Sequence, residues 1–461
     1  MTITLEFLGA NRHVTGSKHL LTVNGRRILL ECGMMQGPRR LSNKLNRNLP
    51  LAPKKIYAVV LSHAHIDHSG SLPRLVKLGY QGNIHCTEAT KDLLGILLPD
   101  SAHIQASDAR YLKKRGHAFE PAYDMEDVER TLKQTRGANY YQPIQICPEV
   151  QVTFLDAGHI LGSAQVILDI DDGKHKLRVG FTGDLGRYRT PILRDPDPLP
   201  RCDVIITEST YGNRTHPQVQ DLNNQIVAVL KEQEEQGGRI LIPAFSIGRT
   251  QNLLWFLGQL MRDGKIPQTT IHVDSPLSTK ATAIAAKHRD LYDQETATML
   301  ELGHDPFQFE GLHFTSDVEE SKRLNGLRKG IIISASGMCE GGRILHHLKQ
   351  TIGRPEDLVL IVGFQAEGTL GRKLLEDYAV VKIYGERHDV QCRVRHIDGL
   401  SAHADRKELS RHLSPLAPTT EKVFVVHGEE HASMQFADRL LSEGFRNIEV
   451  PLYKESFTLR P

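Results

Sequence analysis

The densest group of metal-binding side chains in this sequence is the segment His63-Ala64-His65-Ile66-Asp67-His68. Imidazole and carboxylate groups are the ligands that a divalent ion such as zinc prefers in proteins. Two histidines at positions i and i+2 of a loop can direct their rings at one ion, and Asp67 with His68 can reach a second. The spacing therefore predicts a metal site that other parts of the chain must complete.

Three further residues stand at comparable places, at the ends of apolar runs: His159, Asp184 and His427. Each of them alone is more often a structural residue than a ligand. A site with two ions bridged by water needs about seven protein ligands. These three residues complete that number, and Asp184 is the natural bridging carboxylate.

Short strands are the elements expected to hold these ligands. Asn24-Gly25 between two apolar runs is a strong hairpin signal. Ile56–Leu61 is typical of a buried strand, and it leads directly into His63. Helical spacing follows over 69–78, and 88–142 is expected to be helical. Further strands are expected at Val150–Leu155, Ala164–Ile170, Lys176–Phe181 and Val204–Thr207.

Residues 216–395 follow a different pattern, in which a helix near 222–236 is followed by four strand–loop–helix units. This order predicts a parallel sheet with helices on its faces. Arg249, Arg343 and Arg372 lie at or near helix starts that follow the strand ends. Backbone N–H groups and an arginine at such a start can hold a phosphate. The alternative, that the arginines lie on solvated helix ends and the loop glycines serve tight turns, stays open.

Length and composition narrow the class of protein. A chain of 461 residues favours two domains. The net charge of +2 does not by itself indicate a nucleic-acid-binding surface, so any such surface must concentrate its cations locally. No apolar run is long enough to cross a bilayer, so no membrane partner is expected. The N-terminus alternates like a strand, which argues against a signal peptide. The cysteines are scattered without a C-x-x-C pair, which favours a reduced, cytoplasmic protein.

Taken together, the ligand motifs resemble a known superfamily. His63-x-His65-x-Asp67-His68, Gly158-His159, Thr182-Gly183-Asp184 and a later histidine are similar to the metallo-β-lactamase hydrolases. Further motifs resemble the β-CASP branch, which includes the endonuclease of the mRNA 3′-end cleavage machinery and its bacterial and archaeal relatives. These motifs are Thr207–Gly212, Gly399–Asp405 and Val426–Glu429, and, within the region between them, Ser336–Met338, Gly341–Arg343 and Gly363–Gly371.

The resemblance implies an α/β fold: a metallo-β-lactamase αββα sandwich with an inserted Rossmann-like parallel α/β (β-CASP) domain. The expected metallo-β-lactamase domain comprises 1–215 and 395–461, and the β-CASP domain comprises 216–394. Few residues follow His427, which disfavours the RNase J-type subgroup with its extra C-terminal domain.

The resemblance also implies a role for each site residue. His63, His65 and His159 would hold one ion, Asp67, His68 and His427 the second, and Asp184 would bridge. The ions would be two Zn²⁺, with Mn²⁺ as the alternative. The expected catalytic residues are His403, Glu208 and Asp67, and the expected substrate-binding residues are Ser401, Arg249, Ser336, Arg343 and Arg372. Glu31 stands where the family usually has Asp, whose carboxylate supports the ligand loop. Glu is one methylene longer, so its contacts with the loop could shift and metal affinity could change.

The implied activity is hydrolysis of single-stranded RNA to 5′-phosphate and 3′-hydroxyl ends, by an endonuclease with a 5′→3′ exonuclease activity left open. RNA is preferred over DNA because the DNA-repair members have an apolar residue where this chain has His427. Two alternatives stay open: a small-molecule (thio)ester hydrolase on the same core, and a catalytically inactive RNA-binding scaffold. A homodimer is kept as an open expectation for the assembly.

Overall fold

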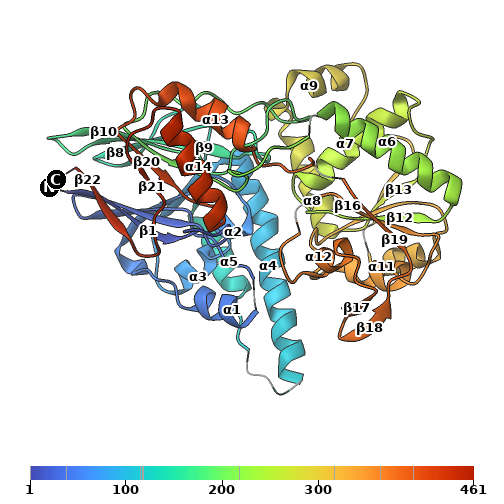
Figure 1. Cartoon of the computed structure of the whole chain (residues 1–461). Helices are drawn as coiled ribbons and strands as arrows, with labels where there is room; N and C mark the ends of the chain where they lie inside the picture. The colour runs from blue at the N-terminus through green and yellow to red at the C-terminus, as the bar shows by residue number, and fades with distance from the viewer. Residues whose placement is uncertain are drawn as a thin grey trace. The chain divides into compact units, whose positions relative to one another are not determined.

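The computed structural model describes residues 2–37, 39–114, 116, 119–217, 219–315, 317–363, 365–397 and 399–460. The chain forms two compact units (Figure 1). Unit 1 comprises Met1–Tyr188, Asp195–Thr215 and His403–Pro461, and unit 2 comprises Arg189–Arg194 and His216–Ala402.

Two sheets form the centre of unit 1, and the described residues give each of them seven strands. The first has the order β22-β1-β2-β3-β4-β5-β6, with β22 (Ser456–Arg460), β1 (Ile3–Gly9), β2 (Lys18–Val23), β3 (Arg26–Leu30), β4 (Ile56–Val60), β5 (Asn83–Thr87) and β6 (Thr135–Ala138). The second has the order β21-β20-β11-β10-β9-β8-β7, with β21 (Ile448–Glu449), β20 (Lys422–Val425), β11 (Val204–Thr207), β10 (Lys176–Phe181), β9 (Ala164–Asp171), β8 (Val150–Asp156) and β7 (Ile144–Cys147).

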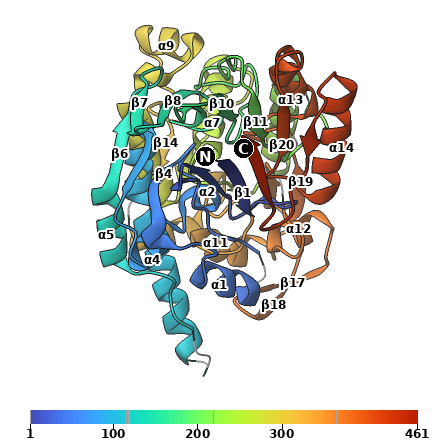
Figure 2. The same ribbon diagram turned by 90° about the vertical axis from the view of Figure 1, so that its left-hand side faces the viewer.

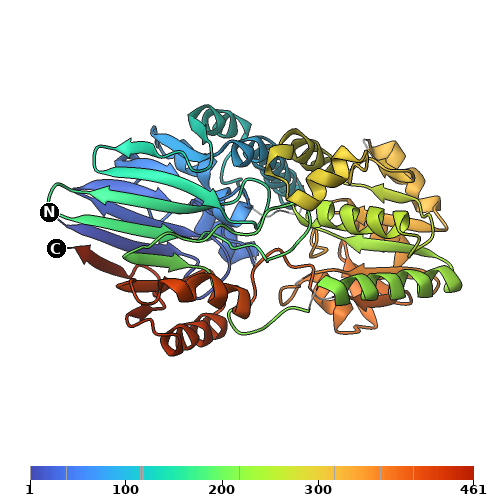
Figure 3. The same cartoon turned by 90° about the horizontal axis from the view of Figure 1, so that it is seen from above.

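Alternate residues of both sheets point into the space between them and form one apolar core. Phe7 of the first sheet and Phe424 of the second are fully buried there, with ring centroids 4.9 Å apart. β1 and β22, from the two ends of the chain, pair antiparallel at one edge (Figure 3). Burial of these side chains holds the two sheets, and therefore their strand ends, in a fixed relation.

Helices cover the outer faces of both sheets (Figure 2). The first sheet carries α2 (Ile66–Ser69), α3 (Leu72–Lys77), α4 (Glu88–Lys114) and α5 (Met125–Gln134), with α1 (Arg39–Arg47) and the 3₁₀ turn η1 (Pro53–Lys55) nearby. The second carries α13 (Arg406–Leu413), η4 (Ser414–Leu416) and α14 (Glu430–Ser442), which share a second apolar cluster with it. Unit 1 is therefore an αββα sandwich, as predicted.

The described residues of unit 2 form a six-stranded sheet of order β14-β13-β15-β12-β16-β19, and all of their pairings in it are parallel. Its strands are β12 (Arg239–Pro243), β13 (Ile271–Val273), β14 (Leu312–Phe314), β15 (Gly330–Ser334), β16 (Leu358–Ile361) and β19 (Arg393–His396), and β17 (Val380–Ile383) with β18 (Glu386–Asp389) forms a separate hairpin. The helices are α6 (Val219–Gln236), α7 (Arg249–Arg262), α8 (Pro276–Lys287), α9 (Gln294–Glu301), α10 (Val318–Arg323), α11 (Arg343–Thr351) and α12 (Leu370–Leu375), with η2 (Arg289–Leu291) and η3 (Leu324–Gly326). The predicted parallel α/β sheet is thus present.

Some elements differ from the sequence-based expectation. The helix expected over 69–78 is divided at Gly70, the C-cap of α2, and α3 starts at Leu72 with Pro73 in its first turn. Within 88–142 the residues that the structure describes form the helices α4 and α5 and also the strand β6, which pairs with β5. Within the described ranges, no helix combines the length and apolar character that a bilayer crossing requires.

Candidate metal centre

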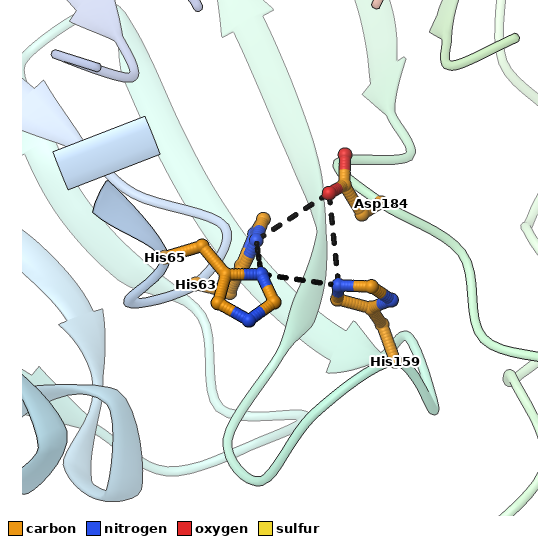
Figure 4. Close-up of side chains that lie close together, drawn as sticks. All are labelled: His63, His65, His159 and Asp184. Atoms are coloured by element: carbon orange, nitrogen blue, oxygen red, sulfur yellow. Dashed lines mark hydrogen bonds and ion pairs between the residues drawn. The ribbon is translucent and has the colours of Figure 1, made fainter. Parts of the chain in front are cut away.

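The residues proposed as metal ligands meet at the C-terminal ends of strands from both sheets of unit 1. β4 leads into the loop of His63 and His65, β10 leads to Asp184, and β20 leads to His427. His159 lies in the loop between β8 and β9. Figure 4 shows His63, His65, His159 and Asp184 with their polar atoms directed at one another.

The first group consists of these four side chains. His65 Nδ1 lies 3.1 Å from His63 Nε2 and 3.3 Å from His159 Nε2. Asp184 Oδ2 lies 3.5 Å from His63 Nε2 and 3.6 Å from His159 Nε2. A tetrahedral ion with bonds near 2.05 Å places its ligand atoms about 3.3 Å apart. The donor set and its spacing therefore fit one divalent ion.

The second group consists of Asp67, His68 and His427. The Nε2 atoms of His68 and His427 lie 3.0 Å apart, and Asp67 Oδ2 lies 3.9 Å and 3.6 Å from them, respectively. Asp184 reaches this group as well, because its Oδ2 lies 3.3 Å from His68 Nε2. Asp184 Oδ1 is buried and accepts no hydrogen bond from the described residues. A carboxylate shared by two groups, with an unsatisfied buried oxygen, suits a bridging ligand.

Three of the histidines also bond to neighbouring side chains through Nδ1, which faces away from the group in His63 and His68, whereas in His427 it lies 3.6 Å from Asp184 Oδ1. His63 Nδ1 lies 2.9 Å from Ser62 Oγ, His68 Nδ1 lies 3.2 Å from Glu31 Oε2, and His427 Nδ1 lies 3.2 Å from Thr210 Oγ1. Such partners orient an imidazole toward a metal and fix its tautomer. Sequence reasoning missed Ser62 and Thr210, although both lie within or beside the motifs that it used.

Glu31 is fully buried beneath the ligand loop. Its Oε1 accepts a hydrogen bond from the backbone N–H of Ser62 at 2.6 Å, while Oε2 faces His68. Burial raises the pKa of this carboxyl group, and the contact with His68 partly opposes that shift. The longer Glu side chain thus reaches both the backbone of Ser62 and the ring of His68.

The protonation preferences of His63, His65 and Asp184 suit cation binding. Burial alone would lower the pKa of His68, but the charges of Asp184 and Asp67 raise it well above the usual value, so a metal must displace a proton there. Burial lowers the pKa of His63 well below its usual value and that of His65 to about 4, so both rings favour the neutral form that binds a metal. Burial alone would raise the pKa of Asp184, but positive charge on His427 and His68 holds it well below the usual value. Asp184 is therefore a carboxylate at any pH near neutrality.

The backbone around the centre is unusually constrained. Glu31 and His427 have φ of 65° and 48°, a left-handed conformation that costs a non-glycine residue about 1 kcal/mol. A Cβ on Gly33 would lie 1.6 Å from the carbonyl oxygen of Asp67, so only glycine allows this approach. Packing of the surrounding strands must supply the free energy that holds these conformations.

His403 and Glu208 form a pair beside the two groups. Nδ1 of His403 lies 3.2 Å from Glu208 Oε2 and 3.8 Å from Asp184 Oδ2. Glu208 is buried and also accepts the backbone N–H of Leu185 at 2.6 Å, which fixes its carboxylate. Burial alone would lower the pKa of His403, but the charges of Glu208 and Asp184 raise it to about 9. This arrangement can keep a proton on the ring at neutral pH.

The residues expected to bind substrate lie in unit 2. The side chain of Arg249 is buried and donates to the carbonyl oxygen of Val362, and Arg343 pairs with the buried Asp274 at 2.5 Å. Arg372 pairs with Glu376 at 2.7 Å on the surface. Ser336 accepts the backbone N–H of Glu340 at 3.0 Å, and Ser401 is buried. The motif Gly363–Gly371 includes Phe364, which lies outside the described residues.

Buried histidines and carboxylates at the strand ends of an αββα sandwich define a metallo-hydrolase. Comparison with known families identifies the branch of this class. "Metallo-beta-lactamase superfamily" matches residues 17–143, "Beta-Casp domain" matches 250–374, and "Zn-dependent metallo-hydrolase RNA specificity domain" matches 387–451.

Whole-chain relatives agree with these matches. Ribonuclease TTHA0252 of Thermus thermophilus is 34% identical over 437 residues, covering 95% of each chain. Transcription termination factor FttA of Methanosarcina mazei is 32% identical over 94% of this chain and 68% of its own length. An RNase J-like protein of Methanocaldococcus jannaschii is 31% identical over 98% and 97%. A crystal structure of a protein of unknown function from Enterococcus faecalis V583 covers 100% of both chains with a TM-score of 0.58 at 13% identity, which shows a shared fold.

The chain therefore belongs to the β-CASP branch of the metallo-β-lactamase superfamily, a family of hydrolytic nucleases.

Proposed function

We propose that this protein is a two-metal ribonuclease that hydrolyses single-stranded RNA and leaves 5′-phosphate and 3′-hydroxyl ends. The observation that carries the proposal is the pair of ligand groups sharing Asp184, with His403 and Glu208 beside them. Support for RNA comes from relatives named as ribonucleases, from the RNA specificity description matched by 387–451, and from the histidine at position 427. We further propose that 1–215 with 395–461 and 216–394 are the two domains, and that the protein is cytoplasmic.

The side chains of the centre have separate tasks in this proposal. His63, His65 and His159 would hold one ion, Asp67, His68 and His427 the other, and Asp184 would bridge them. Two divalent ions bound there, zinc or alternatively Mn²⁺, would lower the pKa of a water molecule and neutralise phosphate oxygens. Glu208 keeps the Nδ1 side of His403 oriented. His403 then donates a proton from Nε2, the opposite ring nitrogen, to the leaving 3′-oxygen.

The residues of unit 2 complete the proposal. Ser401, Arg249, Ser336, Arg343 and Arg372 would serve the RNA backbone, either through contact or by holding the loops at the strand ends. Arg372 is half-exposed and suits direct contact with a phosphate, whereas Arg249 is buried and suits support of a loop. Both kinds of role follow from the position of these residues at the C-terminal edge of a parallel sheet.

The test is cleavage of a 5′-labelled single-stranded RNA beside DNA of the same sequence and a small thioester. We expect RNA cleavage, loss of cleavage in His403→Ala, and 5′-phosphate ends on the products. Turnover of the thioester without RNA cleavage would replace the proposal by the small-molecule hydrolase. RNA binding without any turnover in the metal-loaded protein would identify an inactive scaffold. Light scattering of the same sample measures whether the protein is a homodimer.

A further inference from the structure

Helix α13 carries three cations at the surface of unit 1, a few residues after His403 in the chain. Arg406 and Lys407 stand in its first turn, and Arg411 follows Lys407 by four residues. Lys407 and Arg411 are exposed, and Arg406 is half-buried. Within the part of the chain that the structure describes, none of these three side chains forms an ion pair. Their charge is therefore not neutralised by a neighbouring carboxylate there.

The positions of these cations oppose the formation of the helix. The positive end of the helix dipole lies at the first turn, where it disfavours Arg406 and Lys407. Lys407 and Arg411 are an i,i+4 pair of like charges, which repel each other. On the opposite face of the helix, Leu409 and Leu413 are fully buried against the second sheet, so apolar packing holds α13 despite this repulsion. A bound polyanion would relieve the repulsion.

Two carboxylates of α13 and its cap already have other partners. Asp405 accepts two backbone N–H groups of the first turn, at 2.8 and 2.9 Å, and so caps the helix. Glu408 lies 3.6 Å from Arg187 and accepts the backbone N–H of Tyr188 at 3.2 Å. The side chain of Glu408 is mostly buried. Both carboxylates thus serve the local structure rather than the exposed cations.

An aromatic ring holds Arg411 in place. The centre of its guanidinium group lies 4.0 Å from the centroid of the Tyr188 ring. Such a contact restrains the guanidinium group but supplies no counter-charge. Tyr188 is itself fixed, because its hydroxyl lies 3.0 Å from Nδ1 of the buried His412. Burial raises the pKa of Tyr188, Arg411 opposes that shift, and the exposed Asp195 adds to it. One exposed carboxylate beside three cations leaves the local charge positive.

Backbone contacts hold the start of α13 beside the metal centre. Ala404 donates its N–H to the carbonyl oxygen of Leu185 at 2.7 Å, next to Asp184. Gly186 and His403 form a β-bridge at the same place. The first turn of α13 therefore has a defined position relative to two residues of the proposed chemistry, Asp184 and His403.

We propose that the surface of α13 formed by Arg406, Lys407 and Arg411 binds backbone phosphates of single-stranded RNA beside the scissile position (Figure 1). The choice of RNA as the polyanion rests on the proposed function. In a chain with a net charge of only +2, nucleic-acid binding requires such a local concentration of cations. These contacts would lie on the unit that holds the metal centre, independently of the arginines in unit 2. RNA bound there would also neutralise the like charges within α13.

The experiment compares the metal-loaded full chain with the variant Arg406→Gln/Arg411→Gln/Lys407→Gln and with Lys407→Gln alone. Every protein also carries His403→Ala, so that bound RNA stays intact, and a denaturing gel checks the RNA. Binding of a fluorescent 24-nucleotide single-stranded RNA is measured at salt concentrations from 50 to 200 mM. Melting temperatures are measured for each protein. If the triple variant melts lower than the parent, the single variant, which changes one exposed side chain, decides the outcome.

The matched control is Lys133→Gln/Lys174→Gln/Arg201→Gln. These residues lie shortly before β6, β10 and β11. Because the metal centre lies at the C-terminal ends of strands parallel to these, the control removes the same charge from the opposite end of the sandwich.

We expect the slope of log K against log salt to become smaller by about 2 in the triple α13 variant, since three lost phosphate contacts contribute about 0.7 each. Lys407→Gln should lower the slope by about 0.7, and the control should keep the parental slope. Equal slopes in all proteins, or an equal loss in the α13 variant and the control, would overturn the proposal. So would α13-dependent binding of poly-L-glutamate without any effect on RNA. Because binding is measured without turnover, the result stands even if the parent proves not to cleave RNA.

Discussion

At the scale of single residues, His403 and Asp184 lie 3.8 Å apart but belong to different parts of the proposed chemistry. We expect His403→Ala to lower kcat on RNA by about 10²–10⁴, the usual contribution of a general acid, while both metals stay bound. Asp184→Ala should instead lose metal, because it removes the carboxylate that both ligand groups share. Steady-state kinetics and elemental analysis of the purified variants measure the two effects. Equal metal loss in both variants would show that His403 is a ligand.

Glu31 offers a second prediction at this scale. Its carboxylate bonds both to the backbone of Ser62 and to His68, so Glu31→Asp, although it restores the residue usual in the family, is one methylene too short to keep both contacts. We expect Glu31→Asp and Glu31→Gln each to weaken metal binding about 10- to 100-fold, the usual effect of losing a partner behind a ligand.

Competition with a chromophoric chelator measures the metal affinity of the Glu31 variants. Ser69→Ala is a suitable control, because Ser69 is buried nearby but bonds to the carbonyl oxygens of Ala64 and His65 rather than to a ligand side chain. Unchanged affinity in Glu31→Asp would mean that the loop re-forms its contacts around the shorter side chain.

At the scale of elements, a buried polar network joins α13 to the second sheet. His412 of α13 bonds through Nε2 to Gln165 Oε1 of β9 at 2.8 Å and through Nδ1 to the hydroxyl of Tyr188 at 3.0 Å. Gln165 in turn donates to the carbonyl oxygens of Asp156 and Asp197 at 3.0 Å and 2.7 Å. Since α13 follows His403 and Asp156 precedes His159, the network connects the segments that position His403 and His159.

Burial, together with the nearby charge of Arg411, lowers the pKa of His412 from 6.5 to about 4. A histidine with a depressed pKa in the folded state contributes stability above the unfolded pKa, and that stability is lost as the pH falls from 6.5 toward 4. Between pH 7.5 and 4.5 we expect the free energy of unfolding of the parent to fall by roughly 2 to 3 kcal/mol more than that of His412→Gln. Urea titrations of the metal-free proteins test this, and parallel pH profiles would contradict it.

The elements also show what the sequence could and could not predict. β10 and β11 have the expected bounds, because each is a short, largely apolar run closed by turn residues. The sequence pattern did not predict the division between α2 and α3, and the close approach of Gly70 to Met34, which is distant in sequence, has no signature in the periodicity. Partners such as Thr210 for His427, or Asp274 for Arg343, are distant in sequence, and periodicity carries no information about such pairs.

At the scale of the whole molecule, the predicted ligand set spans the chain from His63 to His427, yet all seven residues lie in unit 1. The motifs could be assigned to one site because each follows a strand, and the ends of these strands meet at one edge of the sandwich whatever their separation in sequence. The contribution of unit 2 to substrate binding depends on loop contacts that no local pattern specifies. Bound metal should therefore change the stability of unit 1 more than the stability of unit 2.

The single tryptophan, Trp255, makes this difference measurable, because it is buried in α7 of unit 2. A ligand that binds only the folded state at 1,000 times its Kd stabilises that state by about 4 kcal/mol. The unfolding of unit 1 is monitored by quenching of a fluorophore attached to the cysteine of the variant Met434→Cys on α14. We expect chelation of the metal to move this transition to a lower urea concentration. The Trp255 transition should move much less. An equal shift of both signals would mean that the units unfold as one cooperative structure, so that metal binding in unit 1 also stabilises the sheet that carries the proposed RNA-binding loops.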